Sequence, residues 1–162
     1  MNNMAVFYDF HQKPHSKPAD EPVVWRPSAY GVLEDKEGRW LFVEPTWTKR
    51  LDLPGGGVEH GELITKGLAR EFYEETGYKV LADELPAYVG QSNFVHKNLG
   101  YCHCILFIYR VSLISDHRDE DVVNTFDDGY EIANSLWIHP SKTVESDVSP
   151  IIWPYIKNLQ GL

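Results

Sequence analysis

The sequence has few cysteines and no long apolar run, and each shortage excludes a class of protein. Two cysteines, Cys102 and Cys104, cannot supply the several bridges of a disulfide-stabilised secreted domain. The longest apolar run, Cys104–Tyr109, is far shorter than the roughly 20 residues of a membrane-spanning helix. Met1–His15 lacks the basic start and apolar stretch of a signal peptide. We therefore expect a cytoplasmic protein that does not bind membranes.

Positive charge is also scarce. The chain has 15 basic and 24 acidic residues, which gives a net charge of −9. The segment Asp116–Glu131 holds seven acidic residues and one arginine, so it accounts for −6 and leaves −3 for the rest. Neither part resembles the basic stripe that duplex nucleic acid or an anionic membrane requires. An acidic protein that binds phosphates usually does so through a divalent cation.

The length of 162 residues fits one domain. Prolines at 14, 18 and 22 interrupt the first 25 residues, which we expect to form an N-terminal arm with a short strand within Ala5–Phe10. The domain proper is then expected at residues 26–162. A homodimer that uses the arm is compatible with this division.

Strand-like segments surround two helical ones in the remainder of the chain. Leu63–Thr76 repeats apolar residues at helical spacing, and a terminal helix is expected at about Pro150–Leu159. Three glycines, Gly55–Gly57, follow Pro54 and predict an irregular loop. Strands are expected at 28–34, 39–44, 87–92, 101–113 and 135–139. This order predicts a mixed α/β layer structure.

The predicted helix Leu63–Thr76 carries Glu71, Glu74 and Glu75 on one face. Carboxylates three and four residues apart repel by a few tenths of a kcal/mol, so a helix selected for stability alone would place lysine among them. The cluster becomes favourable around a divalent cation such as Mg²⁺ or Mn²⁺. Gly67 lies among these acids and costs about 1 kcal/mol in a helix interior, which indicates a close neighbour.

The spacing of these residues resembles a known motif. Gly56, Glu62 and the run Arg70–Tyr78 are similar to the Nudix box, G-x5-E-x7-R-E-U-x-E-E-x-G-U, in which U is a bulky aliphatic residue. All charged and glycine positions match, whereas both U positions are aromatic, Phe72 and Tyr78. The resemblance implies an α/β/α sandwich with a mixed sheet, a catalytic helix over Leu63–Thr76 and a C-terminal helix.

The resemblance also implies roles for individual residues. The metal ligands would be Glu71, Glu74, Glu75 and the carbonyl of Gly55, holding Mg²⁺ or Mn²⁺. Arg70 would orient a glutamate, foremost Glu71, with Glu62 and Gly56 in support. The base that activates water would be Glu71 or a downstream carboxylate, for which the candidates are Asp127, Asp128 and Glu131. Trp47, Lys49 and Arg50 are candidate substrate contacts, against the alternative of an ordinary exposed loop.

The implied reaction is hydrolysis of a pyrophosphate bond in a nucleoside diphosphate linked to another group. A (d)NTP or a nucleotide sugar is the substrate expected, since marks of other subfamilies are absent. One alternative is a nucleotide-binding or sensing module without turnover. Another is an isomerase on the same fold, with Cys102 or Cys104 as the acid or base. The isomerase alternative is disfavoured because side chains two residues apart in a strand point to the same face, so both thiols are expected to lie in the core.

Overall fold

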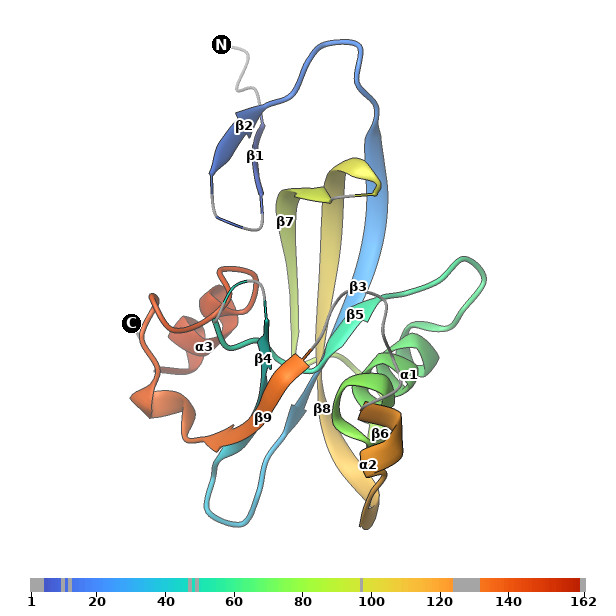
Figure 1. Ribbon diagram of the computed structural model, residues 1–162, viewed down its shortest axis with the longest axis vertical. Helices are drawn as coiled ribbons and strands as arrows, with labels where there is room; N and C mark the ends of the chain where they lie inside the picture. The colour runs from blue at the N-terminus through green and yellow to red at the C-terminus, as the bar shows by residue number, and fades with distance from the viewer. Residues whose placement is uncertain are drawn as a thin grey trace.

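The computed structural model describes residues 5–9, 11, 13–46, 48, 50–96, 98–123 and 132–160. Two sheets and a few helices make up the fold (Figure 1). In chain order the elements are β1 (Val6–Tyr8), β2 (Pro14–Ser16), β3 (Val23–Leu33), β4 (Trp40–Pro45), β5 (Gly55–Gly57), α1 (Ile64–Thr76), β6 (Tyr78–Ala82), β7 (Tyr88–His96), β8 (Gly100–Arg118), α2 (Glu120–Val123), β9 (Ile132–Ile138), the 3₁₀ turn η1 (Pro140–Lys142) and α3 (Trp153–Gln160).

The larger sheet is mixed and is built around the long strands β3 and β8. Its order is β2-β1-β7-β8-β3-β5, and β6 also pairs with β8. The β1–β7 and β3–β8 pairs are parallel and the others are antiparallel. A second sheet contains β4 and β9. Because successive side chains of a strand point to opposite faces, β3 contributes to two cores: Tyr30 and Val32 belong to one cluster, Ala29 and Leu33 to the other.

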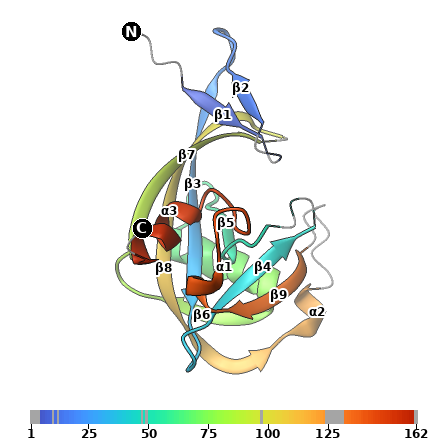
Figure 2. The ribbon, with the colours of Figure 1, turned by 90° about the vertical axis from the view of Figure 1, so that its left-hand side faces the viewer.

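Helices cover the two faces of the larger sheet (Figure 2). Leu68 and Phe72 of α1 are fully buried in one core cluster, with Ala29 and Val111 of the sheet. Ile156 of α3 lies in the other cluster together with residues of β3, β4 and β8. The expected α/β/α sandwich with a mixed sheet is thus confirmed.

The helix predicted at Leu63–Thr76 is observed as α1, Ile64–Thr76. It ends at Gly77, which has a φ of 73°. The Gly77 amide donates a hydrogen bond to the Tyr73 carbonyl, and together these features form a left-handed C-terminal cap. The helix packs closely on β3, because a Cβ added at Gly31 would lie 2.8 Å from the Phe72 ring. The predicted C-terminal helix is observed as α3, three residues shorter at its start.

The prediction of an irregular loop at Gly55–Gly57 is wrong, since these residues form β5 and pair with β3. The glycines permit a close approach of the two strands. Gly55 has φ of 144°, and a Cβ there would lie 2.2 Å from the Ala29 carbonyl oxygen. Three consecutive glycines usually indicate the end of regular secondary structure. Here pairing with β3 compensates for the weak strand preference of glycine.

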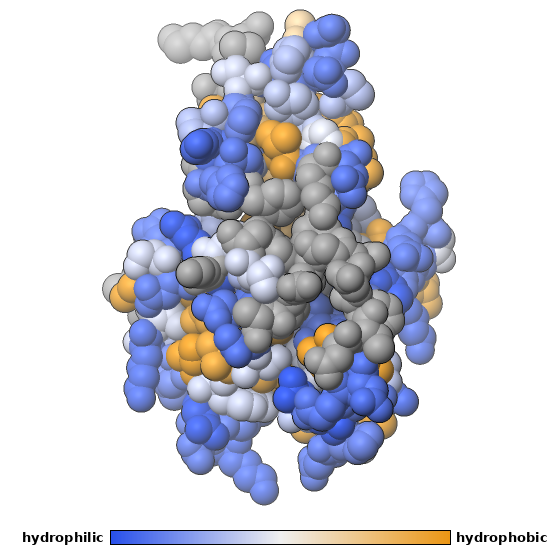
Figure 3. Space-filling model, viewed as in Figure 1, coloured by the Kyte–Doolittle hydropathy of each residue, from blue (hydrophilic) through white to orange (hydrophobic). Residues whose placement is uncertain are grey.

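Part of the N-terminal arm, residues 1–25, joins the larger sheet. β1 and β2 form an antiparallel pair, and Tyr8 of β1 lies beside Phe94 of β7. Phe7 is buried and packs edge-on against Tyr101, with ring centroids 5.1 Å apart. Within the described residues, no helix is both long and apolar enough to cross a membrane. Among the coloured residues of the face in Figure 3, hydrophilic ones predominate and the apolar ones form small separate areas.

Candidate active site

The site is built where the outer edge of β5 meets α1. One edge of β5 pairs with β3, so the backbone groups of Gly55 and Gly57 point to the other edge. There the Gly55 amide donates to Glu75 Oε2 at 2.9 Å, and the Gly57 carbonyl accepts from Arg70 Nη2 at 3.1 Å. The strand thereby presents the Gly55 amide and the Gly57 carbonyl to α1.

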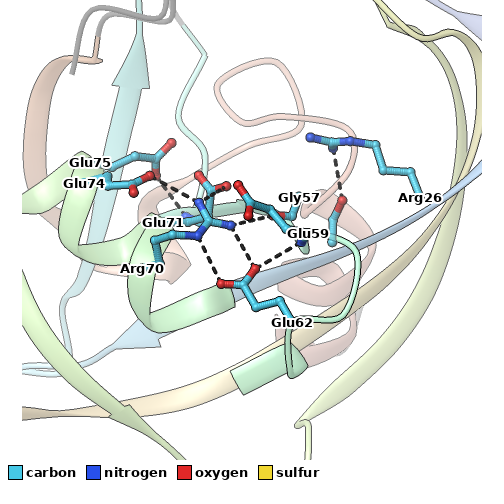
Figure 4. Close-up of polar contacts among 10 residues, drawn as sticks. Arg26, Gly57, Glu59, Glu62, Arg70, Glu71, Glu74 and Glu75 are labelled. Atoms are coloured by element: carbon cyan, nitrogen blue, oxygen red, sulfur yellow. Dashed lines mark hydrogen bonds and ion pairs between the residues drawn. The ribbon is translucent and has the colours of Figure 1, made fainter. Parts of the chain in front are cut away.

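Arg70 connects the carboxylates of this region (Figure 4). Its Nε and Nη2 donate to the two oxygens of Glu62, at 3.1 and 3.0 Å. Its Nη1 donates to Glu71 Oε1 at 2.8 Å and to Glu74 Oε2 at 3.3 Å. The bonds from Arg70 hold the pKa of Glu62 below its usual range, and those to Glu62 in turn raise the pKa of Arg70. We name Arg70, Glu62, Glu71 and Glu74 the Arg70 cluster.

Two glycines make room for the Arg70 cluster. A Cβ at Gly56 would lie 2.8 Å from the Glu71 carboxylate, and a Cβ at Gly67 would lie 2.8 Å from Glu62 Oε2. Gly67 therefore has the close neighbour that its cost in a helix interior indicates. Any larger residue at either position would displace a carboxylate that Arg70 contacts.

The carboxylates of Glu74 and Glu75 are partly buried. Burial raises the pKa of Glu74, and it raises the pKa of Glu75 well above its usual range. Glu75 makes no ion pair with a described residue; its observed hydrogen bond is the one from Gly55. A desolvated carboxylate without a cation is a costly arrangement that a bound cation would relieve.

The donor set fits a hard divalent cation. Three carboxylates and a backbone carbonyl are the oxygen ligands that Mg²⁺ and Mn²⁺ prefer. Across the described part of the chain, no three Asp, Glu, His or Cys side chains converge into a ready-made cage. Glu71 and Glu74 are instead directed to Arg70. Holding a cation would therefore need side-chain rotations at the end of α1 but no change of fold.

Asp52 is a half-buried carboxyl that no sequence motif marks. It lies two residues before Pro54, and its Oδ1 accepts from the Leu53 amide at 2.8 Å while its side chain also bonds to Ser149. Burial outweighs these bonds and raises the pKa of Asp52 to about 7. The segment before α3 lies against this part of the chain, since the Leu51 amide donates to the Asp147 carbonyl and the Ser149 amide donates to the Leu51 carbonyl.

We expect Asp52→Asn to stabilise the metal-free protein at neutral pH. The pKa of Asp52 is higher in the folded chain than in the unfolded one, so the folded state binds the proton more tightly. This contribution is present below about pH 4 and is lost as the pH rises to about 7. Asparagine should thus raise the unfolding free energy by about 1–2 kcal/mol at about pH 8, after allowance for partial solvent access. The gain should vanish near pH 4 in denaturant titrations.

The matched control is Asp83→Asn, which removes the same charge from an exposed loop position. It should leave the pH profile of stability unchanged. A uniform loss of stability in Asp52→Asn at every pH would show instead that the carboxylate is needed as a hydrogen-bond acceptor.

Several residues predicted from the sequence lie outside the described residues: Trp47, Lys49, Asp127, Asp128 and Glu131. Arg50 is half-buried, and the described contacts include none between it and the Arg70 cluster. Cys102 and Cys104 are buried free thiols, as the strand pattern predicts, and burial raises the pKa of both.

The described part of the acidic segment starts beside α1. The Tyr73 hydroxyl donates to Asp119 Oδ2 at 2.7 Å, and the Asp119 amide donates to the Gly77 carbonyl at 2.9 Å. A Cβ at Gly77 would lie 2.3 Å from the Asp119 carbonyl oxygen, so glycine is required there for contact as well as for its positive φ. α2 is thereby attached to the helix that carries the glutamates.

Comparisons with known proteins agree with this geometry. A family model described as the NUDIX domain matches residues 24–159. The nucleoside triphosphatase NudI of Escherichia coli O81 (strain ED1a) is 28% identical over 131 residues, which cover 79% of this chain and 85% of that protein. A MutT-like protein of Streptomyces ambofaciens is 39% identical over 67 residues, or 41% of this chain and 44% of that relative. The second match thus spans less than half of that protein.

Solved structures share the fold. The MutT protein from Methanosarcina mazei Go1 superimposes with a TM-score of 0.59 at 19% identity and covers 88% of this chain and 97% of its own. A UDP-X diphosphatase gives a TM-score of 0.58 at 18% identity, over 90% of this chain and 68% of that one. At such identities the likeness establishes the architecture alone.

Proposed function

This chain belongs to the Nudix hydrolase family, and we propose that it hydrolyses the pyrophosphate bond of a nucleoside diphosphate linked to another group, by attack of water at phosphorus. One observation carries the proposal: the edge of β5 presents its backbone to the face of α1 that carries Glu71, Glu74 and Glu75, where Arg70 holds the first two and the Gly55 amide holds the third. Members of this family generally require a divalent metal ion.

We assign Glu71, Glu74, Glu75 and the Gly55 carbonyl as the ligands of Mg²⁺ or Mn²⁺. When bound, the cation would neutralise phosphate oxygens and acidify the attacking water. Arg70 holds Glu71 and Glu74 in place, and Glu62 fixes Arg70 from the opposite side. Gly56 leaves the space that the Glu71 carboxylate occupies. In this assignment Arg70, Glu62 and Gly56 are positioning residues.

The base that takes the proton from water is assigned to a carboxylate. Glu71 is one candidate, because Arg70 bonds to its Oε1 and leaves Oε2 outside that bond. The others, Asp127, Asp128 and Glu131, follow α2 in the chain. Individual Glu→Gln and Asp→Asn variants with a pH–rate profile for each would separate these candidates: the base is the residue whose replacement removes the fall in rate at acidic pH.

For the substrate we propose a nucleotide-type small molecule, most closely a (d)NTP or a nucleotide sugar. The relative that matches over most of this chain is named a nucleoside triphosphatase, which favours the triphosphate. A screen of dNTPs, NTPs, nucleotide sugars, ADP-ribose, dinucleoside polyphosphates and NADH with Mg²⁺ or Mn²⁺ tests the assignment. Hydrolysis of none of them by folded protein would overturn it.

The two alternatives are less well supported. A silent nucleotide-binding module needs no complete metal-ligand set, yet all three glutamates are present in α1. An isomerase would need an exposed acid or base, whereas the Cys102 and Cys104 side chains are buried. A cytoplasmic location, a homodimer and the absence of nucleic-acid binding stay predictions, as do the contacts of Trp47, Lys49 and Arg50 with substrate.

Metal binding should be visible without turnover. We expect Mg²⁺ or Mn²⁺ at about ten times its Kd to stabilise the folded protein by about 1.4 kcal/mol through mass action. For a domain of this size the gain corresponds to a Tm increase of about 3–6 °C. Thermal unfolding with and without the cation measures it, with NaCl at matched ionic strength as the control. A Tm that does not respond, even with a nonhydrolysable nucleotide present, would contradict the assigned ligands.

A further inference from the structure

Arg26 of β3 is a half-buried cation beside the Arg70 cluster that makes no ion pair with any described residue. Its Nη1 donates to Ser28 Oγ at 3.2 Å, and its guanidinium carbon lies 5.9 Å from the centre of the Phe94 ring. These contacts use one of five N–H donors. Among the described contacts its other donors meet no carboxylate, so they are available to an anionic ligand.

Gly57 joins Arg26 to the site. A Cβ at Gly57 would lie 2.4 Å from Arg26 Nη2, so the guanidinium rests directly on this glycine. The carbonyl of the same residue accepts from Arg70. Figure 4 shows Arg26 reaching over Gly57 from the sheet side, while Arg70 approaches from the helix side. Gly57 is outside the fixed positions of the family motif, so its requirement here comes from Arg26.

The contact with Phe94 orients the arginine. A guanidinium over an aromatic face is held by cation–π attraction, and its N–H donors stay in their own plane. Such a fork is suited to two oxygens of a phosphate. Every other charged side chain in the immediate cluster, apart from Arg70, is a carboxylate that repels phosphate.

We propose that Arg26 is a substrate-binding residue that holds phosphate oxygens of the nucleotide on the sheet side of the site. The lack of a side chain at Gly57 leaves the space in which the Arg26 guanidinium lies. The inference rests on the proposed function for the identity of its ligand. It assigns specificity for a polyphosphate to β3, outside the metal-binding helix.

The test compares Arg26→Gln with Arg110→Gln, which removes the same charge from an exposed position of the adjacent strand β8. In Arg26→Gln we expect KM for the hydrolysed nucleotide to rise about ten- to a hundredfold with little change in kcat, the pattern of lost uniform binding. Titration calorimetry with inorganic tripolyphosphate and Mg²⁺ should show a similar loss of affinity. Arg110→Gln should change neither quantity, and Arg26→Lys should restore part of the affinity.

Gly57→Ala provides a second variant that leaves Arg26 in the sequence. The new methyl group displaces the end of a flexible side chain rather than backbone, so the protein should fold. We expect Gly57→Ala to raise KM as Arg26→Gln does. The variant that carries both substitutions should have a KM no higher than that of either single variant, because each substitution removes the same contact with phosphate.

The two proposals fail in different ways. Unchanged KM and tripolyphosphate affinity in Arg26→Gln, with normal hydrolysis, would overturn the role of Arg26 and leave the proposed reaction intact. Arg26-dependent binding of tripolyphosphate by a chain that hydrolyses no screened substrate would support the role and overturn the reaction. Wild-type protein that binds no tripolyphosphate would overturn the role.

Discussion

Glu75→Gln should lower kcat by about two to three orders of magnitude without destabilising the metal-free protein. Loss of one preorganised group that stabilises charge in the transition state typically costs about 3–4 kcal/mol, or tenfold per 1.36 kcal/mol. The amide keeps an oxygen that can accept from Gly55, so the contact between α1 and β5 persists. It also removes a charge that burial disfavours, so the Tm at neutral pH should stay equal or rise.

The opposite signs of these two effects distinguish a functional carboxylate from a structural one. Steady-state kinetics and thermal unfolding on the same preparations measure them. Glu84→Gln, in the exposed loop after β6, is the matched control and should leave both unchanged. Retention of most of the activity by Glu75→Gln would remove Glu75 from the proposed ligand set. A large loss of stability would assign it to the fold.

The elements that the sequence predicts best are those whose signal is local. α1 has an apolar stripe at helical spacing, and its end is marked by Gly77. Its acidic face could be recognised because a run of mutually repelling carboxylates, a glycine and an arginine at fixed spacing have no common explanation in helix stability. Such signals need no knowledge of the partner elements.

Features that depend on distant partners were missed or misread. The glycines of β5 look like a break until β3 is known to lie against them. The partial burial of Asp52 depends on the segment before α3, which lies far along the chain. Arg26 carries no signal at all, because its position over Gly57 follows from the pairing of β3 with β5. In each case the deciding contact joins residues more than 20 positions apart.

The remaining prediction concerns Arg70, whose replacement by glutamine should reduce both stability and activity. Arg70 is about a quarter exposed, and its loss leaves Glu62, Glu71 and Glu74 without their cation. Breaking a fully buried ion pair costs about 3–5 kcal/mol, so with partial solvent access we expect about 2–3 kcal/mol here. Glu71 and Glu74 would also lose their orientation, and misplacement by about 1 Å can lower kcat about a hundredfold.

A double variant separates the two effects. Adding Glu62→Gln to Arg70→Gln removes one of the carboxylates left unpaired, so denaturant unfolding should show part of the lost stability restored. The rate should not recover, because Glu71 and Glu74 stay without their anchor. Arg39→Gln, which breaks the ion pairs of Arg39 with Asp35 and Glu37 away from the site, should leave kcat unchanged. If activity returned in step with stability in the double variant, Arg70 would act by holding the fold together and would have no part in orienting the glutamates.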